Sequence, residues 1–167
     1  MYVSEKGKNI AVRQEDGRFV LYSSRADIYG AEQWLRRDGD ARDVSEAAWK
    51  KKEDKKIFSC DKLGCIHRQA NGRLIAYVLE SAALTDDCAR ADIIVAPFTV
   101  RNCIGPEIVI DGRALRAQGA HALWFNKNGT ITVETAEESR GLRYWNGARP
   151  RFYQGEARGR AEASRYR

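Results

Sequence analysis

The sequence predicts a mixed α/β domain, with a hairpin-rich mixed sheet and a few short helices. Three turn signals lead to this prediction, because Asp16-Gly17, Asn71-Gly72 and Asn128-Gly129 each lie between two short apolar runs. Such dipeptides are typical of β-hairpins, since Gly accepts the backbone angles that a tight turn requires. Other segments carry apolar residues at helical spacing, which adds helices to the sheet.

The strands follow from short runs rich in β-branched and aromatic residues. Residues 92–96 are short, apolar and β-branched, which is typical of a strand buried on both faces. The first hairpin is expected over residues 9–13 and 19–22. The other expected strands are residues 65–68, 74–79, 108–110, 121–125 and 130–133.

The first helix is expected between Asp27, as its amino-terminal cap, and Gly39, just beyond its end. Its apolar residues recur at helical spacing, so one face should pack on the first hairpin. These residues are Ile28, Ala31, Trp34 and Leu35.

Two more short helices are expected, one capped by Thr85 and one that Asp111 caps and Gly119 ends. The highly charged residues 43–56 indicate a surface linker or a short polar helix. Regular structure is expected to end near Glu138.

The chain of 167 residues fits one domain with a tail. We place a globular α/β domain at residues 1–140 and a basic, aromatic-containing tail, expected to be flexible, at residues 141–167. The longest apolar run, residues 93–100, contains Pro97 and is far shorter than the about 20 residues that a transmembrane helix needs. No direct membrane span is therefore expected, and the amino terminus lacks the apolar core of a signal peptide.

Four cysteines leave three states open. Cys60 with Cys65 and Cys88 with Cys103 can form disulfides, which would require an oxidising compartment. Free buried thiols are the second state. A zinc site is the third, because thiolates bind zinc tetrahedrally, although four and fourteen intervening residues differ from the usual two tight pairs.

Only two histidines are present, too few for a histidine-rich metal centre. Each is expected to be structural, because His67 lies inside an expected strand, His121 begins another, and no His-x-His spacing occurs. Cys65 and His67 would share a strand face, but no orienting acid accompanies them. No catalytic residue is assigned.

Carboxylates near the cysteines or the expected strands have ordinary structural explanations. Asp111 is a helix cap, and negative charge is favourable in a first helical turn. No glycine-rich phosphate loop occurs, and neither a metal ligand nor a cofactor is predicted. The carboxylates concerned are Asp61, Asp86, Asp87, Asp92 and Asp111.

The net charge of +6 is concentrated in the tail, since residues 141–167 contain seven Arg and two Glu, a net charge of +5. Aromatic side chains alternate with these arginines, a mixture able to contact phosphates and stack on bases. The alternative interpretation is a solvated extension without a ligand. The candidate nucleic-acid contacts are Arg143, Trp145, Arg149, Arg151, Phe152, Tyr153, Arg158 and Arg160.

Short motifs run through most of the chain in a fixed order. They are NIAVR (9–13), DGR (16–18), WL (34–35), CDKLGCI (60–66), NGR (71–73), DC (87–88), ADIIV (91–95), Cys103, VID (109–111) and GA (119–120). In their order and spacing, over about residues 9–125, they resemble the carboxy-terminal region of ComEC-type competence proteins of alphaproteobacteria.

In that family a polytopic membrane part forms the channel through which single-stranded DNA enters the cell. Many members end in a metallo-β-lactamase-like domain proposed to degrade the non-transported strand. The resemblance implies a shortened, degenerate form of that domain, because the His-x-His-x-Asp-His pattern is absent and no metal or catalytic residue carries over. It also implies the outer, periplasmic face of the cytoplasmic membrane, where disulfides form. Expressed alone, the chain would be cytoplasmic.

We therefore expect a non-catalytic accessory domain of a DNA-uptake membrane protein. Its expected partners are DNA and the membrane channel portion of a parent protein. The alternative is a metal-dependent nuclease or hydrolase that uses carboxylates and the cysteines. A further alternative is a small interaction module without nucleic-acid affinity.

Overall fold

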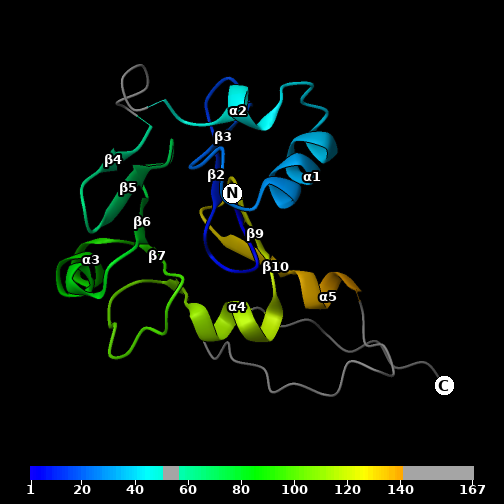
Figure 1. The fold of residues 1–167 in the computed structure, drawn as a ribbon. Coiled ribbons are helices and arrows are strands. Elements are labelled where there is room, and N and C mark those ends of the chain that lie inside the picture. The colour runs from blue at the N-terminus through cyan, green and yellow to red at the C-terminus, as the bar shows by residue number, and fades with distance from the viewer. Residues whose placement is uncertain (51–56, 141–167) are drawn as a thin grey trace.

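Two five-stranded sheets form the centre of the computed structural model, which describes residues 1–50 and 57–140 (Figure 1). Short helices accompany the strands, so the predicted mixed α/β class is confirmed. The predicted tail at residues 141–167 lies outside the described residues, as do the Lys-rich residues 51–56.

The first sheet is antiparallel throughout, with the strand order β10-β9-β1-β2-β3. Two predicted hairpins, β2–β3 and β9–β10, supply four of its strands. The fifth, β1, joins the hairpins, because Tyr2 pairs with Ala11 on one side and Val3 pairs with His121 on the other. The bounds are β1 Tyr2–Val3, β2 Ile10–Arg13, β3 Phe19–Leu21, β9 His121–Phe125 and β10 Ile131–Thr135.

The second sheet is mixed, with the order β4-β5-β6-β7-β8. The predicted middle hairpin forms β5 and β6, with β4 added antiparallel to β5. Strands β6, β7 and β8 are parallel to one another, so crossover segments join them. The bounds are β4 Ser59–Cys60, β5 Gly64–Arg68, β6 Leu74–Val78, β7 Ile93–Val95 and β8 Ile108–Ile110.

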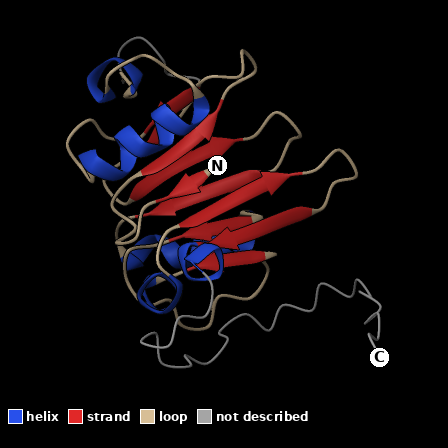
Figure 2. Cartoon of the chain, turned by 90° about the vertical axis from the view of Figure 1, so that its right-hand side faces the viewer, coloured by secondary structure: helices blue, strands red, loops and turns tan. Residues whose placement is uncertain are grey.

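The main core lies between the facing sides of the two sheets (Figure 2), and α4 contributes Leu115 to it. Helices α1 and α2 cover the first sheet, where Trp34 and Leu35 pack with Phe19 as the periodicity predicts. Ile28, predicted on the same face, is instead 49% exposed in the first turn of α1. Helix α3 follows β6 and packs on the second sheet through Leu84. The bounds are α1 Ile28–Asp38, α2 Val44–Ala47, α3 Leu84–Arg90, α4 Gly112–Gln118 and α5 Ala136–Arg140, with a 3-10 turn at Ser81–Ala83.

Two expected helix caps are wrong. Asp27 occupies the predicted cap position of α1 but makes no side-chain cap bond, since its backbone is left-handed (φ 47°) rather than extended as in most capping residues. Thr85 lies inside α3 rather than at its cap, since the 3-10 turn begins the helical segment earlier. The last described helix, α5, ends at Arg140, two residues beyond Glu138, near which regular structure is expected to end.

The charged segment after α1 forms a short helix in its first part. Asp43 accepts a hydrogen bond from the Glu46 N–H, and the Glu46 carboxylate accepts one from the Asp43 N–H, a capping box that begins α2.

No helix within residues 1–50 and 57–140 is long and apolar enough to cross a membrane, which agrees with the expectation of no direct span.

Candidate functional site

Both predicted disulfides are present. Cys60 and Cys65 are joined with an S–S distance of 2.07 Å, and Cys88 and Cys103 with one of 1.97 Å. Of the three states that the sequence leaves open, the structure therefore has the paired disulfides. Bridged sulfurs supply neither the thiolates of a zinc site nor a nucleophile beside His67.

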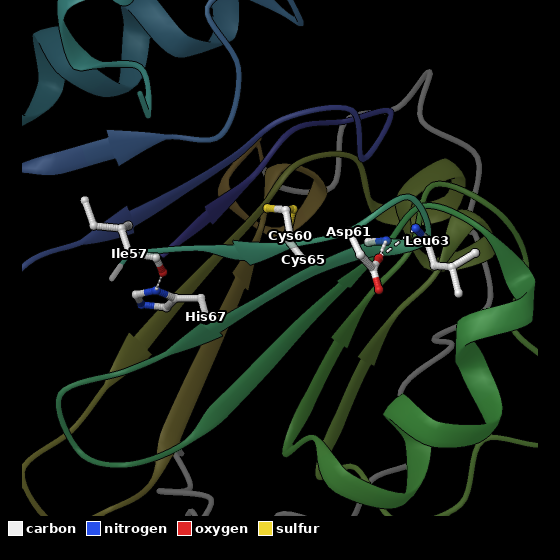
Figure 3. The surroundings of a disulfide bond; sticks show 7 residues. Ile57, Cys60, Asp61, Leu63, Cys65 and His67 are labelled. Atoms are coloured by element: carbon white, nitrogen blue, oxygen red, sulfur yellow. Dashed lines mark hydrogen bonds between the residues drawn. A yellow bond between two sulfur atoms is a disulfide. The ribbon is translucent and has the colours of Figure 1, made fainter. Parts of the chain in front are cut away.

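The loop closed by the Cys60–Cys65 disulfide is held by its own acidic residue (Figure 3). The Asp61 carboxylate accepts hydrogen bonds from the N–H groups of Leu63, at 2.7 Å, and Gly64, at 3.0 Å. These two bonds favour the charged form and lower the pKa of Asp61. The loop is thus a compact turn with its carboxylate already engaged.

Gly64 brings β5 unusually close to β6. A Cβ on Gly64 would lie 2.5 Å from the carbonyl oxygen of Tyr77, so a side chain there would force the backbones apart. The carbonyl of Leu63 accepts hydrogen bonds from the N–H groups of Leu79 and Glu80, each at 2.9 Å. These contacts fix the disulfide loop against the end of β6.

A cleft of about 300 Å³ lies between this loop and α3. One wall is formed by residues 59–61 and 63–66, and the other carries Asp86, Asp87 and Arg90. Partial burial, and then the negative charges of Asp61 and Asp86, raise the pKa of Asp87. The cleft is therefore predominantly acidic, with Arg90 as the opposing charge.

The acidic cleft has no metal-binding geometry. Within residues 1–50 and 57–140, no three His, Cys, Asp or Glu side chains gather closely enough to hold a metal ion. The alternative of a hydrolase that uses carboxylates together with the cysteines thus finds no ligand set in this part of the chain. What the cleft can offer is an electrostatic surface for cationic groups.

Both histidines have partners from the chain itself. In His67, Nδ1 lies 2.7 Å from the Ile57 carbonyl oxygen (Figure 3) and Nε2 lies 3.2 Å from Gln69 Oε1. In His121, Nδ1 lies 2.8 Å from the Gly119 carbonyl oxygen. Burial lowers the pKa of His121. These contacts are those of structural histidines, on two different sheets.

The remaining carboxylates that the sequence singles out hold the backbone. Asp92 accepts a hydrogen bond from the Leu74 N–H at 2.7 Å. Asp111 caps α4 by accepting hydrogen bonds from the N–H groups of Arg113 and Ala114, as predicted. Neither residue lines the cleft between the disulfide loop and α3.

A second hollow, of about 440 Å³, lies between the β2–β3 turn and the end of α1. Four of its six charged side chains form ion pairs, since Arg13 binds Asp38 and Arg42 binds Asp40. The hydrogen bonds from Arg42 lower the pKa of Asp40. This arrangement is that of a surface ion-pair cluster rather than of a site prepared for a ligand.

Sequence reasoning found part of the cleft and missed part. Asp61, Asp86 and Asp87 stand out as carboxylates near the cysteines, but nothing local indicates that Arg90 shares their cleft. The predicted nucleic-acid contacts, which run from Arg143 to Arg160, lie outside the described residues.

Comparison with family models, with curated proteins and with solved structures finds no match for this chain.

Proposed function

We propose that this chain is a non-catalytic accessory domain of a ComEC-like DNA-uptake membrane protein. The observation that carries the proposal is where the disulfides fall. Cys60, Cys65, Cys88 and Cys103 all belong to the motifs on which the family resemblance rests. Disulfides persist in oxidising compartments, in keeping with a position on the outer face of the cytoplasmic membrane.

A binding or structural role fits the chemistry of the described residues better than catalysis does. The four thiols are bridged, and both histidines have partners within the chain. The metal-ligand pattern of the related domains is missing from the sequence. The role proposed is to support the membrane channel portion of the parent protein.

DNA is the proposed ligand of the carboxy-terminal arginines. Seven Arg and only two Glu occupy residues 141–167, and aromatic residues stand between the arginines. Contacts of this kind bind the phosphate backbone without reading sequence, and they weaken steeply as salt rises.

The test of the uptake role is made in a naturally competent host whose parent protein carries this region. Deleting the region should abolish transformation while labelled double-stranded DNA still binds the cell surface. A matched control deletes a loop of similar length in another extracytoplasmic part of the same protein. Full transformation after deletion of the region would contradict the proposal.

The test of DNA binding uses the full chain and a variant with five tail substitutions, in which Arg143, Arg149, Arg151, Arg158 and Arg160 are each changed to Gln. If about five phosphate contacts are lost, the slope of log K against log salt should flatten by roughly 4 to 5 on duplex DNA. Absence of binding by the unchanged chain at low salt would favour an interaction module without nucleic-acid affinity. DNA cleavage upon metal addition would favour the nuclease alternative.

A further inference from the structure

The two disulfides are held by the fold in different ways. Cys60 and Cys65 are directly opposite each other on the antiparallel strands β4 and β5, with their Cα atoms 4.0 Å apart. Cys88 of α3 and Cys103 lie in separate segments, with Cα atoms 5.4 Å apart. The strand register therefore determines the spacing of the first pair, whereas the second pair joins a helix to a loop.

The spacing of the first pair is unfavourable for a disulfide. Disulfide-bonded cysteines usually have Cα atoms about 4.4–6.8 Å apart, and pairs outside this range are more easily reduced. Cys60–Cys65 lies below this range, and Cys88–Cys103 lies within it. Hydrogen bonding from Asp61 N–H to the Gly64 carbonyl, at 3.0 Å, holds the hairpin next to the disulfide and prevents the strands from moving apart.

The two cysteines of the first disulfide differ in exposure. Both border the cleft of about 300 Å³ between the disulfide loop and α3, while the disulfide lies on the side of β5 that packs in the main core. Cys60 is half-buried, whereas Cys65 is only 3% exposed. An attacking thiolate would therefore approach the sulfur of Cys60, and Cys65 would be the leaving group.

We propose that Cys60–Cys65 is a redox switch, which a dithiol reductant opens in the folded protein while Cys88–Cys103 stays closed. One thiolate of the reductant bonds to Cys60 Sγ and breaks the S–S bond, and the Cys65 thiolate takes up a proton. The second thiol of the reductant then displaces Cys60 as a thiol. The protein gains two electrons and two protons, and the reductant leaves as its disulfide.

Opening this disulfide should loosen only the wall of the cleft. Phe58, which precedes β4, is 2% exposed and packs against Trp49 and His67, with ring centroids 5.5 Å and 5.6 Å away. That anchor does not depend on the disulfide. Without the disulfide, residues 59–64 are held by backbone hydrogen bonds alone, so this segment opens more often and alters the acidic cleft without unfolding the second sheet.

The test equilibrates the oxidised full chain in mixtures of dithiothreitol and oxidised dithiothreitol. Free thiols are then trapped with N-ethylmaleimide and located by peptide mass spectrometry. Circular dichroism follows the fold in the same samples. Cys60 and Cys65 should become modified at a dithiol-to-disulfide ratio about tenfold lower than Cys88 and Cys103, a difference of about 30 mV. Opening of both pairs together, opening of Cys88–Cys103 first, or opening only upon unfolding would overturn the proposal.

Hydrogen exchange supplies a second readout on the unmodified chain. At the ratio that opens only Cys60–Cys65, amides of residues 59–64 should exchange at least tenfold faster, while those of β6 and β7 keep their protection. A C88S/C103S variant is the matched control, because the potential of Cys60–Cys65 should be unchanged in it. Loss of protection throughout β6 and β7 would show a structural disulfide rather than a switch.

Discussion

At the scale of single residues, Asp111 shows how one buried carboxylate serves two segments. Its Oδ1 accepts hydrogen bonds from the N–H groups of Arg113 and Ala114 at the start of α4. Its Oδ2 accepts one from Val100 N–H, at 3.0 Å, in the loop after β7. The cap is visible in the sequence, but the bond to Val100 is not, because eleven residues separate the partners.

Replacing Asp111 separates these two roles. Asp111→Ala should lower the free energy of unfolding by about 2 kcal/mol, since it removes a helix cap and leaves the buried Val100 N–H unpaired. Asp111→Asn should cost less, because its amide oxygen can still cap α4. Urea unfolding of the three proteins checks this order, and equal losses in both variants would contradict it.

His121 should make stability depend on pH. Burial lowers its pKa below the ordinary 6.5, so the unfolded state binds more protons between the two values. Stability is therefore complete above about pH 6.5 and falls as pH drops towards the folded-state pKa. Urea unfolding at pH 7.5, 6.5 and 5.5 should show a smaller loss on acidification for His121→Gln than for the unchanged chain.

Comparing the acid-induced loss of stability in the unchanged chain and in His121→Gln separates the contribution of His121 from that of other titrating groups. Burial lowers the pKa of the Met1 α-amino group to about 5, so that group also titrates in this range, but it is present in both proteins. An equal acid loss in both would show that His121 makes no contribution.

At the scale of elements, local turn chemistry accounts for the hairpins. Gly17, Gly72 and Gly129 all adopt positive φ, as the turn signals predict. The loop between β4 and β5 has no such dipeptide. Its Asp61 instead binds the backbone two and three residues ahead, a turn that the sequence analysis did not identify.

The two disulfides should contribute unequally to stability. In the chain-entropy model, the pair separated by 15 residues contributes about 3 kcal/mol and the pair separated by 5 residues about 2 kcal/mol. The C88A/C103A variant should therefore lose more stability than C60A/C65A. Urea unfolding without reductant measures both, and the opposite order would contradict the model.

At the scale of the whole molecule, the two sheets are joined by packing and by a buried hydrogen bond. The Tyr77 hydroxyl, on β6, donates to the Gly7 carbonyl, between β1 and β2, at 2.8 Å. Burial raises the pKa of Tyr77, so the phenol remains a donor at all ordinary pH values. The ring of Tyr22 packs edge-on against Tyr77, with centroids 4.8 Å apart.

Tyr77→Phe should lower the free energy of unfolding by about 1 kcal/mol, because it keeps the ring and leaves the Gly7 carbonyl unpaired. Tyr22→Phe is the matched control, with an expected change within about 0.5 kcal/mol, since the Tyr22 hydroxyl has no hydrogen-bond partner among the described residues. Thermal unfolding of both variants distinguishes the buried bond from ring packing. A loss in Tyr22→Phe equal to that in Tyr77→Phe would contradict the assignment.

The sequence by itself determined the three hairpins, the buried strand β7, three of the four apolar positions on the face of α1, and the cap of α4. Each depends on residues within one turn or one strand, where backbone geometry and side-chain periodicity act locally. The cysteine pairing was one of three states consistent with the sequence, because spacing alone does not place sulfur atoms in contact.

Only the tertiary structure decided which hairpins share a sheet and which side chains share a cleft. Val3 pairs with His121 across 118 positions of the chain, and a strand of two residues has no periodicity to predict it. Asp61 and Arg90 face the same cleft because β7 pairs with β6 and α3 crosses between them. Such neighbours follow from burying the faces of two sheets against each other, a requirement that the whole chain meets at once.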